Sequence, residues 1–276
     1  MRQVEVDMNR ATQIKSIAED SRLSINGRVE AILSVREEVD ADTDEYYKLG
    51  CTVFETIRAL LLGDNYEECR RDDLLMCDCL LAEAYWHTSR NWLIAPLAQE
   101  LYAMLAGSLT TDPGKLSIYS QVLSRVCYCL RGTGHPRLMM KLLAIRLGYE
   151  KALPEPDPEN LEDIAGDLYR LALLTDCNTW LGTVEADVVA ILGAEKMKAI
   201  EKAPQMGHLK ADPVEYTEQW ENIIDKVEAE VGVELAGEPV CMGFCFKYWS
   251  VKERVLHKYG IDWRSPMLMN PGVTFD

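Results

Sequence analysis

Apolar residues recur at spacings of three and four along almost the whole chain, as they do on one face of an α-helix. The clearest stripe consists of Tyr46, Leu49, Val53, Ile57 and Leu60. The alternation typical of a half-buried strand is nearly absent. Its one candidate, residues 239–246, contains Gly243 and is expected to form an extended connector instead. The sequence therefore predicts an all-α fold.

Glycine- and proline-rich turns divide this pattern into helices of similar length. After two helices near residues 42–62 and 72–87, we expect helices at Trp92–Ala106, Lys115–Leu130, Arg137–Lys151, Asn160–Leu174 and Thr179–Leu192. Pro96 either kinks its helix or marks the start of it.

Two capping boxes mark further helix starts, one at Asp42 with Glu45 and one at Asp212 with Glu215. Behind the second box, an apolar stripe predicts one continuous helix; it consists of Tyr216, Trp220, Ile223, Val227 and Val231.

Short loops between amphipathic helices make consecutive helices antiparallel neighbours. Over residues 42–192 this spacing of helical pairs resembles the tetratricopeptide-like class of α-helical repeats, although the signature residues of that repeat do not recur in register. The resemblance implies a stacked α-solenoid, and a compact multi-helix bundle is the alternative. We expect amphipathic helices at 1–41, a hairpin core at 42–203, and C-terminal helices with an extended tail at 204–276, all in one continuous domain.

The composition disfavours several classes of binding partner and several cellular locations. The net charge of −16 repels phosphate groups, so neither nucleic acid nor an anionic membrane is an expected partner. No apolar run approaches the roughly 18 residues that span a bilayer, and the start of the chain lacks the apolar core of a secretory signal. With nine cysteines, free thiols in a reducing cytoplasm are expected.

The charge is unevenly distributed. Residues 155–238 hold 20 acidic and 6 basic side chains, a net charge of −14, whereas residues 244–264 carry a net charge of +3. Either these two regions dock on each other, or both form solvated faces.

The sequence gives no positive evidence for a catalytic or metal site, and no cofactor is expected. In the pairs Cys77/Cys79 and Cys127/Cys129 the thiols would point about 200° apart on a helix, so one ion cannot bind both. We expect all four cysteines to pack in the core.

Other candidates for chemistry have simpler interpretations. Cys241 and Cys245 are expected to pack in the core, with a shared metal or a disulfide as alternatives. The segment 72–78 has the spacing of the magnesium-binding motif of trans-prenyl synthases, but Asp72 also suits a helix start and no second motif follows. Surface or helix-capping positions are expected for the histidines, His87, His135, His208 and His257.

Aromatic side chains lie on successive predicted helices. They form either core or a groove that grips a partner peptide. The candidate groove residues are Tyr85, Trp86, Trp92, Tyr102, Tyr128, Tyr149 and Tyr169.

The C-terminal tail is unusually apolar. Before it, Gly260 suits the position after a helix end, and Ile261 is placed to pack back on the last turn. Because an apolar tail left in water invites aggregation, we expect it to strap across its own domain, with a partner or second subunit as the alternative. The candidate anchors are Trp263, Met267, Leu268, Met269 and Phe275.

Three functions are compatible with these features. The leading hypothesis is a cytoplasmic protein-interaction or scaffold module that binds a protein or peptide partner and has no evident catalytic site. The alternative is an α-helical enzyme or small-ligand-binding protein with a pocket between helices. A lesser alternative is an acidic regulator that mimics nucleic acid.

Overall fold

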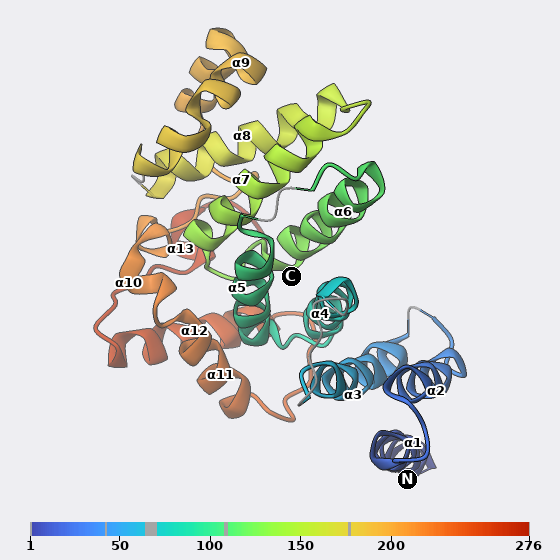
Figure 1. Ribbon diagram of the computed structural model, residues 1–276. Coiled ribbons are helices and arrows are strands. Elements are labelled where there is room, and N and C mark those ends of the chain that lie inside the picture. The colour runs from blue at the N-terminus through green and yellow to red at the C-terminus, as the bar shows by residue number, and fades with distance from the viewer. Residues whose placement is uncertain (1, 42, 64–70, 108–109, 176–177, 276) are drawn as a thin grey trace. The chain divides into compact units, whose positions relative to one another are not determined.

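The computed structural model describes residues 2–41, 43–63, 71–107, 110–175 and 178–275. Over these residues the chain forms thirteen α-helices and two short 3₁₀ helices, with no strand (Figure 1). The prediction of an all-α fold is confirmed. None of the helices so described is long and apolar enough to cross a membrane. The chain packs as two compact units, Met1–Met104 and Leu105–Asp276. The sequence-based division into the segments 1–41, 42–203 and 204–276 stays a prediction.

The first unit contains α1 to α4 and nearly all of α5. Their bounds are Arg2–Glu19 (α1), Ile25–Glu37 (α2), Asp44–Leu61 (α3), Arg71–His87 (α4), Asn91–Leu93 (the 3₁₀ helix η2) and Ile94–Leu105 (α5). The first three helices pack against one another, and α3 packs against α4. The predicted stripe of α3 supplies core side chains, since Leu49, Val53 and Ile57 are all buried.

The start of α3 differs slightly from the prediction. Its N-cap is Thr43, whose hydroxyl accepts a hydrogen bond from the Tyr46 amide over 3.2 Å. Asp42, the predicted cap, lies outside the described residues. Pro96 falls in the first turn of α5, where proline is tolerated, so it marks a helix start.

Four long helices open the second unit. They are α6 (Pro113–Leu130), α7 (Pro136–Ala152), α8 (Pro158–Thr175) and α9 (Asn178–Lys202), and each packs against the next. The helix predicted to end at Leu192 does break there, because Gly193 has φ 68° and ψ 165°. A further helical segment up to Lys202, which the sequence did not indicate, follows this kink.

The rest of the second unit consists of shorter elements. These are η3 (Pro213–Tyr216), α10 (Glu218–Glu221), α11 (Ile224–Glu234), α12 (Phe244–Lys258) and α13 (Pro266–Met269). The capping box of Asp212 and Glu215 is confirmed, but the single helix predicted behind it is wrong. Thr217 interrupts it, because its hydroxyl donates to the Val214 carbonyl and accepts from the Trp220 amide.

A separate apolar core holds these shorter elements together. It is formed by Trp220, Ile224, Val227, Val231, Leu235, Val251, Val255, Leu256, Ile261 and Trp263. Gly260 (φ 77°) ends α12, and the Ile261 amide donates to the Leu256 carbonyl over 3.1 Å. This is the predicted helix stop, with Ile261 buried against the last turn.

The C-terminal part of the acidic region docks on the basic region, in line with one of the two sequence-based alternatives. Helices α11 and α12 pack side by side. Ion pairs across them join Lys252 to Glu228, Arg254 to Glu234, Lys258 to Glu230 and, beyond the end of α11, Lys247 to Glu238.

Candidate functional site

A cavity of about 680 Å³ lies within the second unit. Its volume falls in the range of ligand-binding clefts, roughly 300–1,000 Å³. One side is formed by the end of α6, the α6–α7 turn and α8, and the other by the segment 203–216. Its apolar lining consists of Leu130, Pro136, Met139, Leu171, Ala203, Met206 and Ala211. Its ionisable lining consists of Arg131, His135, Asp167, Arg170 and Glu215.

The α6–α7 turn is fixed by contacts with α10 and α11. His135 is buried, with its Nε2 2.8 Å from Asp225 Oδ1 and its Nδ1 4.0 Å from Glu221 Oε1. Glu221 also accepts a hydrogen bond from the Leu138 amide over 3.0 Å, at the start of α7. A carboxylate is stabilised at a helix N-terminus, so the chain itself fills this anion-binding position. Of the two positions expected for His135, surface or helix-capping, the surface position is wrong. The residue stands at the N-cap of α7, although its side chain makes no capping hydrogen bond.

Three charged side chains form the edge of the cavity along α6 and α8. Arg131 donates from Nη2 to Asp167 Oδ2 over 2.7 Å, and Arg170 Nη1 lies 3.7 Å from Asp167 Oδ1. Burial raises the pKa of Asp167 above its ordinary value, although Arg131 opposes this effect. The Arg131 side chain is 60% exposed, so this edge is open to solvent.

The opposite wall is held by the residues that follow α12. Asp212 and Glu215 cap η3, and both also bind this later segment. Arg264 donates to Asp212 Oδ2 from its amide over 2.9 Å and from Nε over 3.0 Å. Trp263 donates its indole N–H to Glu215 Oε1 over 2.8 Å. The Asn270 side chain bonds both the amide and the carbonyl of Lys210.

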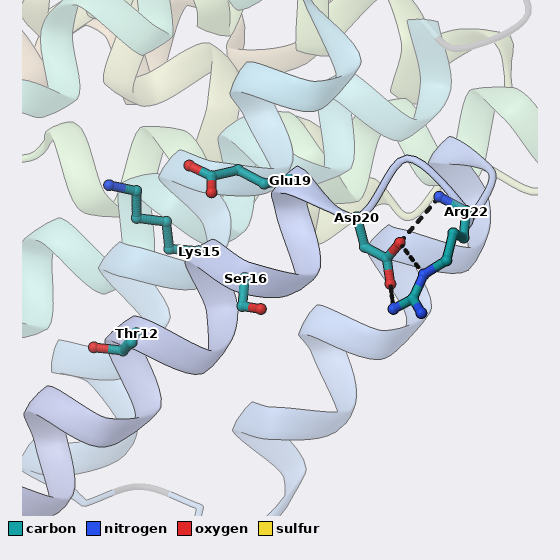
Figure 2. Close-up of a pocket in the computed structure, with 6 residues that line it drawn as sticks. All are labelled: Thr12, Lys15, Ser16, Glu19, Asp20 and Arg22. Carbon is teal, nitrogen blue, oxygen red and sulfur yellow. Dashed lines mark hydrogen bonds and ion pairs between the residues drawn. The ribbon is translucent and has the colours of Figure 1, made fainter.

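A shallower hollow in the first unit lies beside the end of α1 (Figure 2). Its lining is polar, from Thr12, Lys15, Ser16, Glu19, Asp20 and Arg22. Figure 2 shows Arg22 folded onto Asp20, with hydrogen bonds of 2.7 to 3.0 Å, while the side chains of α1 point in different directions. This hollow lacks converging groups and is not a candidate site.

The seven predicted groove aromatics occupy different environments. Tyr85, Tyr149 and Tyr169 are buried, whereas Tyr128 is exposed. Trp86, Trp92 and Tyr102 are partly buried. Four of the seven lie in the first unit and three in the second, and none lines the cavity.

The predicted tail anchors are also divided. Trp263 is buried in the core of the shorter elements, and Phe275 packs edge-on against Trp249 with ring centroids 5.1 Å apart. Met269 is partly buried, whereas Met267 and Leu268 are exposed. The main polar contact of the tail is made by Asn270, which the sequence did not suggest.

Four of the six cysteines that were expected in the core are buried there. Cys77, Cys79, Cys127 and Cys129 are buried, which confirms the prediction that they pack in the core. Cys245 is partly buried and Cys241 is exposed, so the core expectation is wrong for Cys241. It lies in the α11–α12 loop, where Val240 and Met242 are also exposed, at 84% and 86%. Within the part of the chain that is described, no three His, Cys, Asp or Glu side chains are grouped to hold a metal ion.

Comparison with known proteins gave no match, whether to a protein-family model, a curated protein or a solved structure.

Proposed function

We propose that this chain is a binding module that takes a peptide segment of a protein partner into the cavity of its second unit. The observation that supports the proposal is the cavity itself, about 680 Å³ with an apolar lining and a charged edge. Clefts of this kind bind ligands by burying apolar surface and use a few polar groups for orientation. The open edge at Arg131 suits a chain end that enters from solvent.

The same cavity also supports the second candidate, a small-ligand-binding protein or enzyme. The partly buried carboxylate of Asp167, with its raised pKa, is the observation in favour of that interpretation. We prefer a peptide because the edge of the cavity is open to solvent at Arg131. The second carboxylate of the lining, Glu215, is already engaged by the Asp212 amide and the Trp263 indole.

Mimicry of nucleic acid receives less support. Such a mimic presents a row of free carboxylates, but many acidic residues of 155–238 form ion pairs with basic side chains. The paired residues are Glu162, Asp167, Asp187, Asp212, Glu221, Glu228, Glu230, Glu234 and Glu238.

Two architectural expectations form part of the proposal. We infer that the pairs α6–α7 and α8–α9 are hairpins of tetratricopeptide-like character, which their consecutive packing supports. We also infer that residues 263–275 strap across their own unit and fix the wall at 210–216. The bonds of Arg264 to Asp212 and of Asn270 to Lys210 support this inference.

A reducing, cytoplasmic location is proposed on the basis of the free buried cysteines.

Selection from a random peptide library displayed on phage tests the proposed function. Ala203→Trp places an indole at the cavity wall, and Ala152→Trp makes the same change at an exposed position outside the cavity. We expect peptides that bind the wild type and Ala152→Trp but not Ala203→Trp. Selected peptides that bind all three proteins equally would refute the use of this cavity.

A further inference from the structure

The two arginines that line the cavity are not separately paired, although the lining also holds two carboxylates. Arg131 and Arg170 share one carboxylate, that of Asp167. The other acidic lining residue, Glu215, already accepts bonds from the Asp212 amide and the Trp263 indole through Oε1. Beyond this edge, in an adjoining hollow along α8, Glu162 is paired with Lys196. Asp163 lines that adjoining hollow and not the cavity, whereas Arg131, Asp167 and Arg170 line both.

Arg170 is the less fully engaged of the two arginines. Its ion pair with Asp167 spans 3.7 Å, which exceeds hydrogen-bond distance, whereas Arg131 bonds the same carboxylate at 2.7 Å. A guanidinium group presents parallel N–H donors that match the two oxygens of a carboxylate. A second carboxylate placed between Arg131 and Arg170 would therefore meet N–H donors of Arg170 that Asp167 does not engage at hydrogen-bond distance.

Apolar side chains adjoin this position. Met139 and Leu171 line the cavity from α7 and α8, and Met206 lines it from the opposite wall. Methionine side chains adapt to apolar groups of different shape. A ligand that fits both features carries a carboxylate next to an apolar group. An internal peptide segment without acidic residues has no such carboxylate, whereas the end of a peptide chain does.

We propose that the cavity binds the free C-terminal carboxylate of a partner peptide between Arg131 and Arg170, with the last side chain of that peptide, an apolar one, packed among Met139, Leu171 and Met206. This inference rests on the proposed function and specifies which part of the partner is bound. A free aliphatic carboxylic acid has the same chemistry and is distinguished by the experiment below.

Calorimetric titration with three probes tests the inference: the peptide acetyl-Gly-Ser-Gly-Leu-Leu with a free C-terminal acid, the same peptide as its amide, and octanoate. We expect the acid to bind at least about tenfold more tightly than the amide, since a charge-assisted pair is lost in the amide. The difference should disappear in Arg170→Gln and in Arg131→Gln. Arg170→Lys should keep part of the difference in affinity, because lysine retains the positive charge but lacks the paired N–H donors of a guanidinium group.

The control is Arg254→Gln, which removes an arginine of similar exposure from an ion pair in the same unit but outside the cavity. It should retain the preference for the acid. Melting temperatures of all variants identify any that fail to fold, and the charge-conserving Arg170→Lys then carries the test.

Each outcome has a distinct meaning. Equal affinity of acid and amide, with both lost in Ala203→Trp, would overturn the carboxylate inference and leave the proposed function standing. Tighter binding of octanoate than of the peptide acid would overturn the assignment to a peptide end. Absence of binding by either peptide at millimolar concentration would overturn the inference, while the phage selection decides the proposed function separately.

Discussion

Trp263 donates its indole N–H to Glu215 Oε1 over 2.8 Å, across 48 positions of the sequence. Glu215 lines the cavity, and Trp263 belongs to the core formed by α10, α11 and α12. The bond therefore joins the wall of the proposed binding site to the buried core of the C-terminal segment. Residues 263–270 bond to the segment 210–216 and do not line the cavity themselves.

Deletion of residues 265–276 should lower the melting temperature of the protein by about 5 °C. The deletion removes the two bonds of Asn270 to the backbone of Lys210, worth roughly 1 kcal/mol each, and the contact of Phe275 with Trp249. Calorimetry measures the change. Thr274→Ala, at an exposed position of the same segment, is the control and should melt as the wild type does. An unchanged melting temperature in the deletion would show that the tail does not stabilise its own unit.

Gly134→Ala should destabilise the second unit by at least about 2 kcal/mol. Gly134 has φ 89°, and a Cβ atom there would lie 2.5 Å from Trp220 Nε1 and 3.0 Å from Ile224 Cγ1. Both neighbours are buried, so overpacking adds to the cost of the left-handed backbone. Urea unfolding followed by tryptophan fluorescence gives the value.

Gly132→Ala is the matched control, two residues earlier in the same turn. It has φ 76°, but a Cβ atom would meet nothing within 4 Å. The substitution should cost only about 1 kcal/mol, the backbone part alone. Equal effects of the two substitutions would contradict the close packing of Gly134 on Trp220.

Asp78→Asn should alter the pH dependence of stability of the first unit. Asp78 is fully buried, and burial raises its pKa from 3.8 to about 6 despite the ion pair with Arg58. Between pH 4 and pH 6 the folded state therefore binds more protons than the unfolded state, so this group destabilises the fold as pH rises. Relative to Asp78→Asn, the wild type should lose on the order of 2 kcal/mol between pH 4 and pH 7.

Denaturant unfolding of both proteins at a series of pH values provides this comparison. Asp20→Asn serves as a contrast, because the exposed pair with Arg22 lowers the pKa of Asp20 to about 2. Its effect on the pH dependence should have the opposite sign and be small. A stability difference between wild type and Asp78→Asn that stays constant with pH would be incompatible with a raised pKa.

Lys252→Met should destabilise the second unit by about 3 kcal/mol. The Lys252 ammonium lies 2.7 Å from Glu228 and within 5.2 to 5.7 Å of the rings of Trp220, Tyr248 and Trp263. Its removal leaves a mostly buried carboxylate without its cation. Lys258→Met removes the exposed partner of Glu230 and should cost less than about 1 kcal/mol. Thermal unfolding measures the stability that each variant loses. Similar losses in Lys252→Met and Lys258→Met would show that the aromatic rings around Lys252 do not strengthen its ion pair.

Local features of the fold could be predicted from sequence because neighbouring residues determine them. Gly260 and Ile261 end α12 as expected, since the required left-handed residue and the apolar contact are adjacent in the chain. The capping box at Asp212 was also predicted correctly. The continuous helix behind it was not, because Thr217 offers a competing cap only one turn later.

The candidate site could not be predicted in the same way. Two helices supply the charged residues Arg131, Asp167 and Arg170, and the spacing of these residues in the sequence does not indicate a shared site. His135 had a detectable signal, since histidine before proline in a glycine-rich turn suggests the start of a helix. Its burial depends on Asp225, 90 positions later, which only the packed structure reveals. The aromatic residues misled for a related reason, because their periodicity indicates a helix face but not what covers it.

Chemical-shift mapping of the ¹⁵N-labelled protein with acetyl-Gly-Ser-Gly-Leu-Leu as the free acid tests the central claim most directly. The account predicts the largest shifts at the amides of Gly132, Gly134 and Gly207, which line the cavity on both sides, and at Arg170. Shifts confined to the exposed apolar loop at Val240 and Met242, with the cavity amides unchanged, would contradict it.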